Sequence, residues 1–189
     1  MTTSTYILIA AVVIALYLVI SFNRLVALRQ AWQRAFADID VQLKQRHDLV
    51  PNLVETVKGY AAHESCVFTS VTQARANAMR AVTIPEKSAA EGALSGALAN
   101  LFAVAENYPQ LKANENFLKL QEELSDLENK IAAARRFLNN AVAEYNTAIQ
   151  QFPPVLFSGA LGFTQAQMFQ LDAAEKAEAK EPPKVSLGG

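Results

Sequence analysis

The sequence predicts an all-α protein, in which an N-terminal transmembrane helix runs into a long antiparallel helical bundle with coiled-coil-like packing. Two observations lead to this fold class. Glycine is scarce, with 7 in 189 residues, and long segments of strong helix formers follow one another. Along these segments apolar residues recur in alternating steps of four and three, which is the spacing of helices packed nearly parallel or antiparallel.

Residues 1–22 are expected to form a membrane anchor. "YILIAAVVIALYLVI" begins at Tyr6, and no charged side chain occurs before Arg24. A spanning helix needs roughly 20 apolar residues. A cleaved signal peptide and a buried core helix are the alternatives, but the charged start and the cleavage site of a signal peptide are missing. The expected anchor residues are Tyr6, Ile7, Leu8, Ile9, Val12, Val13, Ile14, Leu16, Tyr17, Leu18, Val19 and Ile20.

Basic residues follow the apolar segment directly. Arg24, Arg29 and Arg34 precede the first acidic residue. By the positive-inside rule, this charge asymmetry predicts a single-pass protein whose C-terminal bundle lies in the cytoplasm.

The bundle is expected over residues 23–170, with helices at about 23–81, 89–106 and 115–151. "TIPEKS" separates the first two helices, and Ser88 with Glu91 has the spacing of a capping box. "FPP" ends the third helix. The tail 171–189 is rich in Ala, Glu, Lys and Pro and is expected to be disordered.

"VLFSGALGF" follows the third helix and has no helical period. It is too apolar for a solvated linker. We expect a loop that packs back on the bundle end or touches the membrane or a partner. Its candidate contact residues are Val155, Leu156, Phe157, Leu161 and Phe163.

Pro51 lies inside the first predicted helix. If the helix continues, Pro51 removes the hydrogen bond to the carbonyl of His47 and kinks the helix. Alternatively, Asp48 caps a new helix and Pro51 falls in its first turn. The unbroken apolar spacing from Leu43 to Val57 favours the kinked continuous helix.

Arg46 and Glu64 fall on the apolar face of the first predicted helix. Burying them unpaired would cost several kcal/mol, so we expect partners on a facing helix within residues 122–146, where Asn139 and Asn146 share a face. The interpretation is a polar network that fixes helix register. Two alternatives stay open, namely that both side chains reach solvent at the edge of the face, or that they form a ligand site.

No enzymatic, metal or cofactor site is predicted. His47 and His63 point to nearly opposite sides of a straight helix, and the spacing of a zinc-binding His-Glu-x-x-His motif is absent. The single cysteine, Cys66, is expected to be packed, with no oxyanion hole or orienting group near it. A net charge of −1 gives no reason to expect nucleic-acid binding.

Three segments carry a resemblance to a known family. "FNRLVALRQAWQRAFADIDVQLKQRHDLVPNLVETVKGYAAHE", "LANLFAVAENYPQLKANENFLKLQEELSDLENKIAAARRF" and "AEYNTAIQQFP" closely resemble the LemA family of bacterial membrane proteins, in matching order and spacing. The resemblance implies an N-terminal anchor followed by a helical bundle at a bacterial inner or internal membrane. It does not imply an enzymatic activity, and some members of the family are linked to the formation of internal bacterial membranes.

The leading functional hypothesis is a membrane-anchored scaffold that forms homo-oligomers and organises or remodels the membrane. Its partners are then the lipid bilayer and further copies of the chain. The alternative is a tethered adaptor or signalling module, which binds another protein through its bundle or the loop 155–163.

Overall fold

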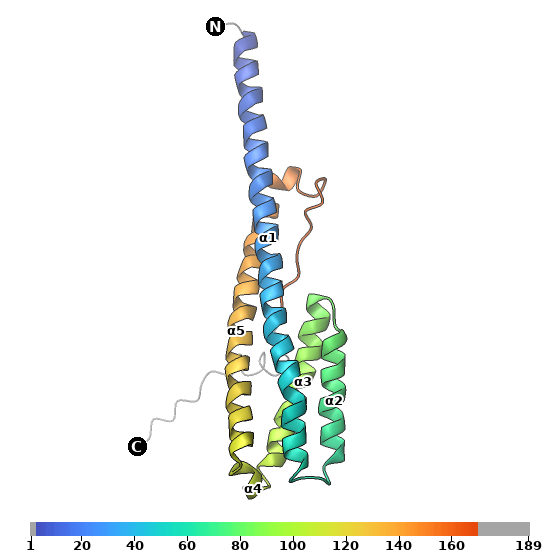
Figure 1. The fold of residues 1–189 in the computed structure, drawn as a ribbon. Helices are drawn as coiled ribbons and strands as arrows, with labels where there is room; N and C mark the ends of the chain where they lie inside the picture. Colours follow the sequence, from blue (N-terminus) through green and yellow to red (C-terminus); the bar gives the residue numbers. More distant parts are fainter. Residues whose placement is uncertain (1–2, 170–189) are drawn as a thin grey trace, which may run out of the picture. The chain divides into compact units, whose positions relative to one another are not determined.

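A computed structural model describes residues 3–169, which are helical apart from turns and loops and contain no strand. The predicted all-α class is confirmed. The helices are α1 (Thr3–Lys58), α2 (Ser65–Arg80), α3 (Ile84–Ala105), α4 (Pro109–Lys112) and α5 (Glu115–Gln150), followed by a 3₁₀ turn, η1 (Pro154–Leu156) (Figure 1). The predicted disordered tail, 171–189, lies outside the described residues.

The chain divides into two compact units. Among the described residues, unit 1 contains residues 3–40 and 134–168, and unit 2 contains residues 41–133 and Phe169. Helices α1 and α5 each contribute to both units.

Unit 1 is built on the antiparallel packing of α1 against the second half of α5 (Figure 1). Leu25 from α1 is buried with Tyr145 and Ile149 from α5 and with Phe163 from the segment after η1. The Trp32 ring packs near Tyr145, with ring centroids 6.3 Å apart. Burying these large apolar side chains supplies the main stabilisation, at about 1.5–3 kcal/mol for each.

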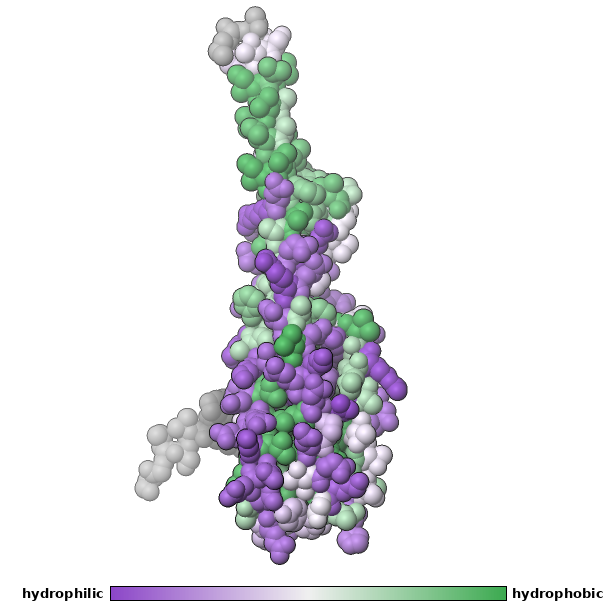
Figure 2. Space-filling view, in the orientation of Figure 1, coloured by the Kyte–Doolittle hydropathy of each residue, from purple (hydrophilic) through white to green (hydrophobic). Residues whose placement is uncertain are grey.

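The N-terminal part of α1 is apolar and uncovered. All twelve expected anchor residues are exposed, from 40% for Tyr17 to 67% for Ile20, and Figure 2 shows hydrophobic side chains over this stretch. Two helices within the described residues are long and apolar enough to cross a membrane, α1 and α3. Only 6% of the apolar window of α1 is buried against 39% of that of α3, which supplies core residues of unit 2.

Unit 2 packs the end of α1, α2, α3, α4 and the first half of α5 around one apolar core. The core includes Leu53 and Val57 from α1, Val71 from α2 and Leu101 from α3, each at most 1% exposed. Because the same core receives residues from every helix of the unit, their mutual positions depend on side-chain packing as well as on the short turns.

The predicted single helix over 23–81 is wrong. Helix α1 ends at Lys58, the chain turns through residues 59–64, and α2 starts at Ser65. Gly59 is a weak helix former and begins the turn. The apolar spacing continues across the turn because both helices of this hairpin bury one face. The spacing therefore indicates which residues are buried, but not whether one helix continues through them.

The second predicted helix starts earlier than expected. Helix α3 begins at Ile84, and its capping box pairs Thr83 with Glu86, not Ser88 with Glu91. Pro85 falls in the first turn, where its missing N–H costs no helical bond. The third predicted helix, 115–151, agrees with α5 to within a residue.

Candidate functional site: a buried arginine network

Arg46 is a buried residue of α1 in unit 2 and is 1% exposed. Its Nη1 donates to Ser95 Oγ at 3.0 Å and to Glu128 Oε1 at 2.6 Å. Its Nη2 donates to the Glu91 carboxylate and to the Glu91 carbonyl oxygen, the latter at 3.3 Å. One guanidinium on α1 therefore connects α3 and α5.

His47, the next residue on α1, extends the network. Its Nε2 lies 2.7 Å from Glu91 Oε1, so both carboxylate oxygens of Glu91 are engaged by α1. Arg75 on α2 donates from Nε to the backbone carbonyl of His47 at 2.6 Å. The network thus joins α1, α2, α3 and α5.

The Arg75 contact follows from Pro51. Helix α1 passes through Pro51 without interruption, so Asp48 lies inside the helix and caps no new one. Proline has no N–H, and its missing bond is the one to the carbonyl four residues earlier, at His47. Arg75 supplies the donor that the helix lacks at that carbonyl.

The electrostatics of the network favour charged groups. Burial lowers the pKa of Arg46, but the charges of Glu128 and Glu91 and their hydrogen bonds outweigh burial and raise the pKa above its ordinary value. Burial likewise raises the pKa of Glu91, but the hydrogen bond from His47 and the charge of Arg46 hold it below 4.5. Arg46 and Glu91 therefore form an ion pair at neutral pH.

The chemistry available here is structural. Both oxygens of Glu91 are bonded within the chain, and its side chain is only 6% exposed. Glu128 is the member that meets solvent, with 43% of its side chain exposed. A carboxylate engaged through both oxygens holds helices in register, whereas Arg46 Nε is buried without a hydrogen-bond partner among the described residues.

Of the four residues predicted for this network, Arg46 forms its centre through bonds to Glu91 and Glu128. Glu128 lies within the 122–146 stretch expected to supply the partner of Arg46. Glu64 stands half-buried before α2 and makes no capping bond with its side chain. Asn139 is a half-buried residue of α5 in unit 1.

Asn146 lies in unit 1, where it binds the backbone of Ala166. Its Oδ1 accepts from the Ala166 N–H at 2.9 Å, and its Nδ2 donates to the Ala166 carbonyl at 2.8 Å. This two-way bond ties the segment after η1 to α5. Leu25 and Phe163 are buried next to it in the same unit, so the bond holds Phe163 close to its apolar partners.

Sequence reasoning missed Glu91, although a signal existed. Glu91 shares a helix face with Leu94, Leu98 and Leu101, all of them buried. A carboxylate on an apolar face needs a basic partner. The Ser-x-x-Glu pattern concealed this signal because it also matches a capping box, which moved Glu91 to a solvent-exposed helix start.

His63 and Cys66 are the other two reactive residues that the sequence brings to attention. His63 lies exposed in the turn before α2, and Cys66 is exposed, so the expectation of a packed cysteine is wrong. Within residues 3–169, no three His, Cys, Asp or Glu side chains are placed to hold a metal ion.

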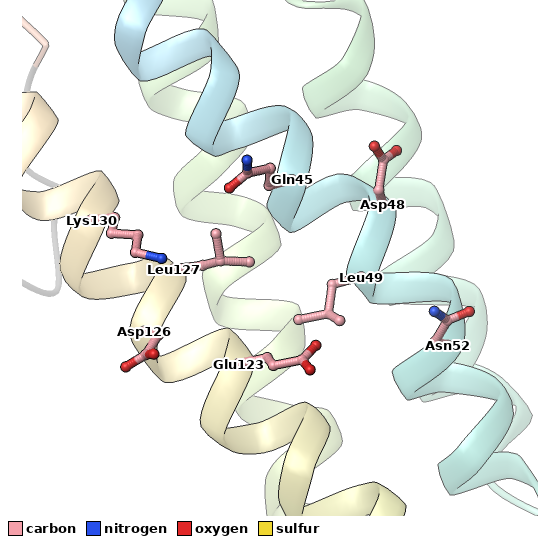
Figure 3. A pocket seen from close by; sticks show the side chains of 8 residues that line it. All are labelled: Gln45, Asp48, Leu49, Asn52, Glu123, Asp126, Leu127 and Lys130. Carbon is pink, nitrogen blue, oxygen red and sulfur yellow. The ribbon is translucent and has the colours of Figure 1, made fainter.

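A surface groove in unit 2 lies between α1 and α5 (Figure 3). Three carboxylates line it, from Asp48, Glu123 and Asp126, together with Lys130. The side chains of Asp48 and Asp126 point away from each other, so they do not converge on a common ligand (Figure 3).

Comparison with known proteins places this architecture in context. The chain is similar to magnetosome protein MamQ of Magnetospirillum gryphiswaldense, at 25% identity over 178 residues, covering 80% of this chain and 65% of the relative. A MamQ protein of Paramagnetospirillum magneticum matches at 25% over 179 residues, with 81% and 66% covered. The chain thus spans slightly less than two thirds of these relatives. Protein LemA of Metamycoplasma hominis matches at 25% over 161 residues, with 82% and 72% covered.

The LemA family model matches residues 35–187, which include the whole polar network and most of both units. The match begins inside α1, beyond the exposed apolar stretch of that helix. The chain belongs to the LemA family.

Proposed function

We propose that this protein is a single-pass, membrane-anchored helical scaffold, without enzymatic activity, that self-assembles and organises or remodels a bacterial membrane. One observation supports the proposal most directly. The exposed apolar stretch of α1 and the residues that pack on α5, such as Leu25 and Trp32, belong to one unbroken helix. A helix without a flexible linker transmits the orientation of the anchor to unit 1.

The orientation follows from the flanking charges. Arg24, Arg29 and Arg34 follow the apolar stretch, and the first acidic residue is Asp38. Under the positive-inside rule, the helical body then lies in the cytoplasm.

Self-assembly requires a surface other than the apolar faces that define the bundle. Leu124, Leu138 and Val142 are buried within the chain and are not available to a second copy. Other large apolar side chains are exposed on the helices, among them Val41, Leu118 and Phe137. The similarity to two magnetosome proteins supports association with a membrane, and the role in membrane organisation is part of the proposal.

The test is the mass of the detergent-solubilised full chain over a wide concentration range, followed by imaging of the protein in lipid. A scaffold is expected to form discrete oligomers in detergent and ordered arrays in lipid. A protein that stays monomeric at every concentration and forms no array refutes the scaffold and leaves the tethered adaptor.

A further inference from the structure

The turn after α5 is unusually apolar for a surface segment. No charged residue occurs between Glu144 and Asp172, in a chain where 19% of residues are charged. Four large apolar side chains of this turn are nonetheless exposed: Phe152 at 77%, Val155 at 48%, Leu156 at 73% and Leu161 at 49%. Exposure of such a patch costs free energy in water and marks an interaction surface.

The position of the turn identifies what covers it. Leu18, Val19 and Phe22, at the end of the apolar stretch of α1, line one groove together with Phe157, Ala160 and Leu161. The rings of Phe22 and Phe163 meet edge to face, with centroids 5.7 Å apart. Figure 2 shows the hydrophobic colouring of α1 continuing onto this turn. The apolar turn is thus a lateral extension of the surface that crosses the bilayer in the proposed function.

Basic side chains begin directly beyond the turn. Arg24 is exposed two residues after Phe22, and the guanidinium of Arg29 lies 5.0 Å from the centroid of the Phe163 ring. The order along α1 is therefore apolar stretch, apolar turn, then arginines. Phospholipids present the matching order of acyl chains, interface and anionic headgroups.

We propose that the turn 152–161 inserts into the interfacial layer of the same bilayer that α1 crosses, as a second membrane contact of unit 1. This inference rests on the proposed membrane anchor. The turn is held for this role from within the unit, because Phe163 is buried and Asn146 binds Ala166 on its C-terminal side. Two contacts, one through α1 and one beside it, restrict the tilt of unit 1 at the membrane, whereas a single helix leaves tilt free.

The test measures lipid contact at single positions of the full-length chain. In a Cys66→Ser background, Leu156→Cys carries an environment-sensitive fluorophore, and Leu161→Cys provides a second position in the turn. Phe137→Cys is the matched control, because Phe137 is an exposed apolar residue of the same unit, 62% exposed. It lies about 20 Å along α5 from its end, at ~1.5 Å per residue. Ile14→Cys reports on the anchor itself.

The proteins are reconstituted into vesicles of phosphatidylcholine and phosphatidylglycerol that contain spin-labelled phospholipids as quenchers. We expect labels at 156 and 161 to be quenched several-fold more than the label at 137, most strongly by lipids labelled near the headgroup. The label at 14 is quenched most by lipids labelled deep in the acyl chain.

Each other result overturns a defined part of the reasoning. Quenching at 14 with no excess at 156 and 161 over 137 refutes the interfacial turn and leaves the anchor intact. A blue-shifted label at 156 that lipid does not quench shows that protein covers the turn, which also refutes the inference. Absence of quenching at 14 refutes the anchor, and the inference falls with it.

Discussion

The two carboxylates that pair with Arg46 differ in their surroundings, and this difference makes the network testable. The Glu91 side chain is 6% exposed and that of Glu128 is 43% exposed. Glu91→Gln keeps the size of the side chain but removes its charge, which leaves a buried guanidinium with Glu128 as its remaining anion. Removing one member of a buried pair costs about 3–5 kcal/mol. Because Glu128 still balances the charge of Arg46, we expect Glu91→Gln to lower the free energy of unfolding by about 3 kcal/mol.

Glu128→Gln is the matched control. Water screens the charge of Glu128, so its contribution resembles that of an exposed pair, about 0–1 kcal/mol. The two substitutions should therefore differ by about 2 kcal/mol in the free energy of unfolding. Urea unfolding of the full chain in detergent micelles, followed by far-UV circular dichroism at pH 7, measures the difference. An equal loss, or a larger loss for Glu128→Gln, refutes the claim that the buried Arg46–Glu91 pair dominates the network.

Three further predictions concern pH and local structure. Because the pKa of Glu91 is lowered by folding, its stabilising contribution is complete above the ordinary value of 4.5 and is lost as the pH falls through the folded-state value. The urea midpoint of the wild type should therefore fall more steeply below that pH than the midpoint of Glu91→Gln. Thr83→Ala removes the side-chain acceptor at the start of α3 and should cost about 1 kcal/mol in thermal or urea unfolding. Gly162 has φ +76°, a conformation that favours glycine, so Gly162→Ala should cost about 1 kcal/mol of folding free energy. Gly96 lies in the interior of α3 with open space around it, so Gly96→Ala should stabilise the protein by up to about 1 kcal/mol. Thermal melting curves of the two variants beside the wild type measure both effects.

The sequence was most informative where residues that begin or end a helix agree with the apolar repeat. Helix α5 was predicted to within a residue because the Pro153-Pro154 pair ends a clean apolar repeat. At the start of the helix, the Phe117 N–H donates to Asn114 Oδ1 at 3.0 Å, so a side-chain cap is also present. Local backbone chemistry and side-chain burial were independent signals there, and each supported the other.

The sequence was least informative about which helices meet. Arg46 could be identified as a buried cation from one helix alone, but its partners lie 45 and 82 residues away along the chain. Asn139 and Asn146 share a face with each other, yet that face belongs to unit 1 and Arg46 to unit 2. Periodicity gives the inward face of a helix and not the helix opposite it, so the pairing of polar groups required the tertiary structure.

The Arg75 contact offers a test of why a proline is tolerated in the middle of α1. Arg75→Leu should leave the His47 carbonyl, in a residue only 7% exposed, without a donor, at a cost of about 1–3 kcal/mol. Pro51→Ala restores the helical N–H to that carbonyl, so in this background Arg75→Leu should cost at least about 1 kcal/mol less.

Urea unfolding of the wild type, both single variants and the double variant gives the coupling energy directly. Thr72→Leu is the control, because Thr72 is an exposed α2 residue whose hydroxyl bonds only to its own helix, at the Phe68 carbonyl. Its effect should be the same with Pro51 and with Ala at that position. If the effects of Pro51→Ala and Arg75→Leu simply add, Arg75 does not compensate for the proline, and its bond to His47 is incidental to the continuity of α1.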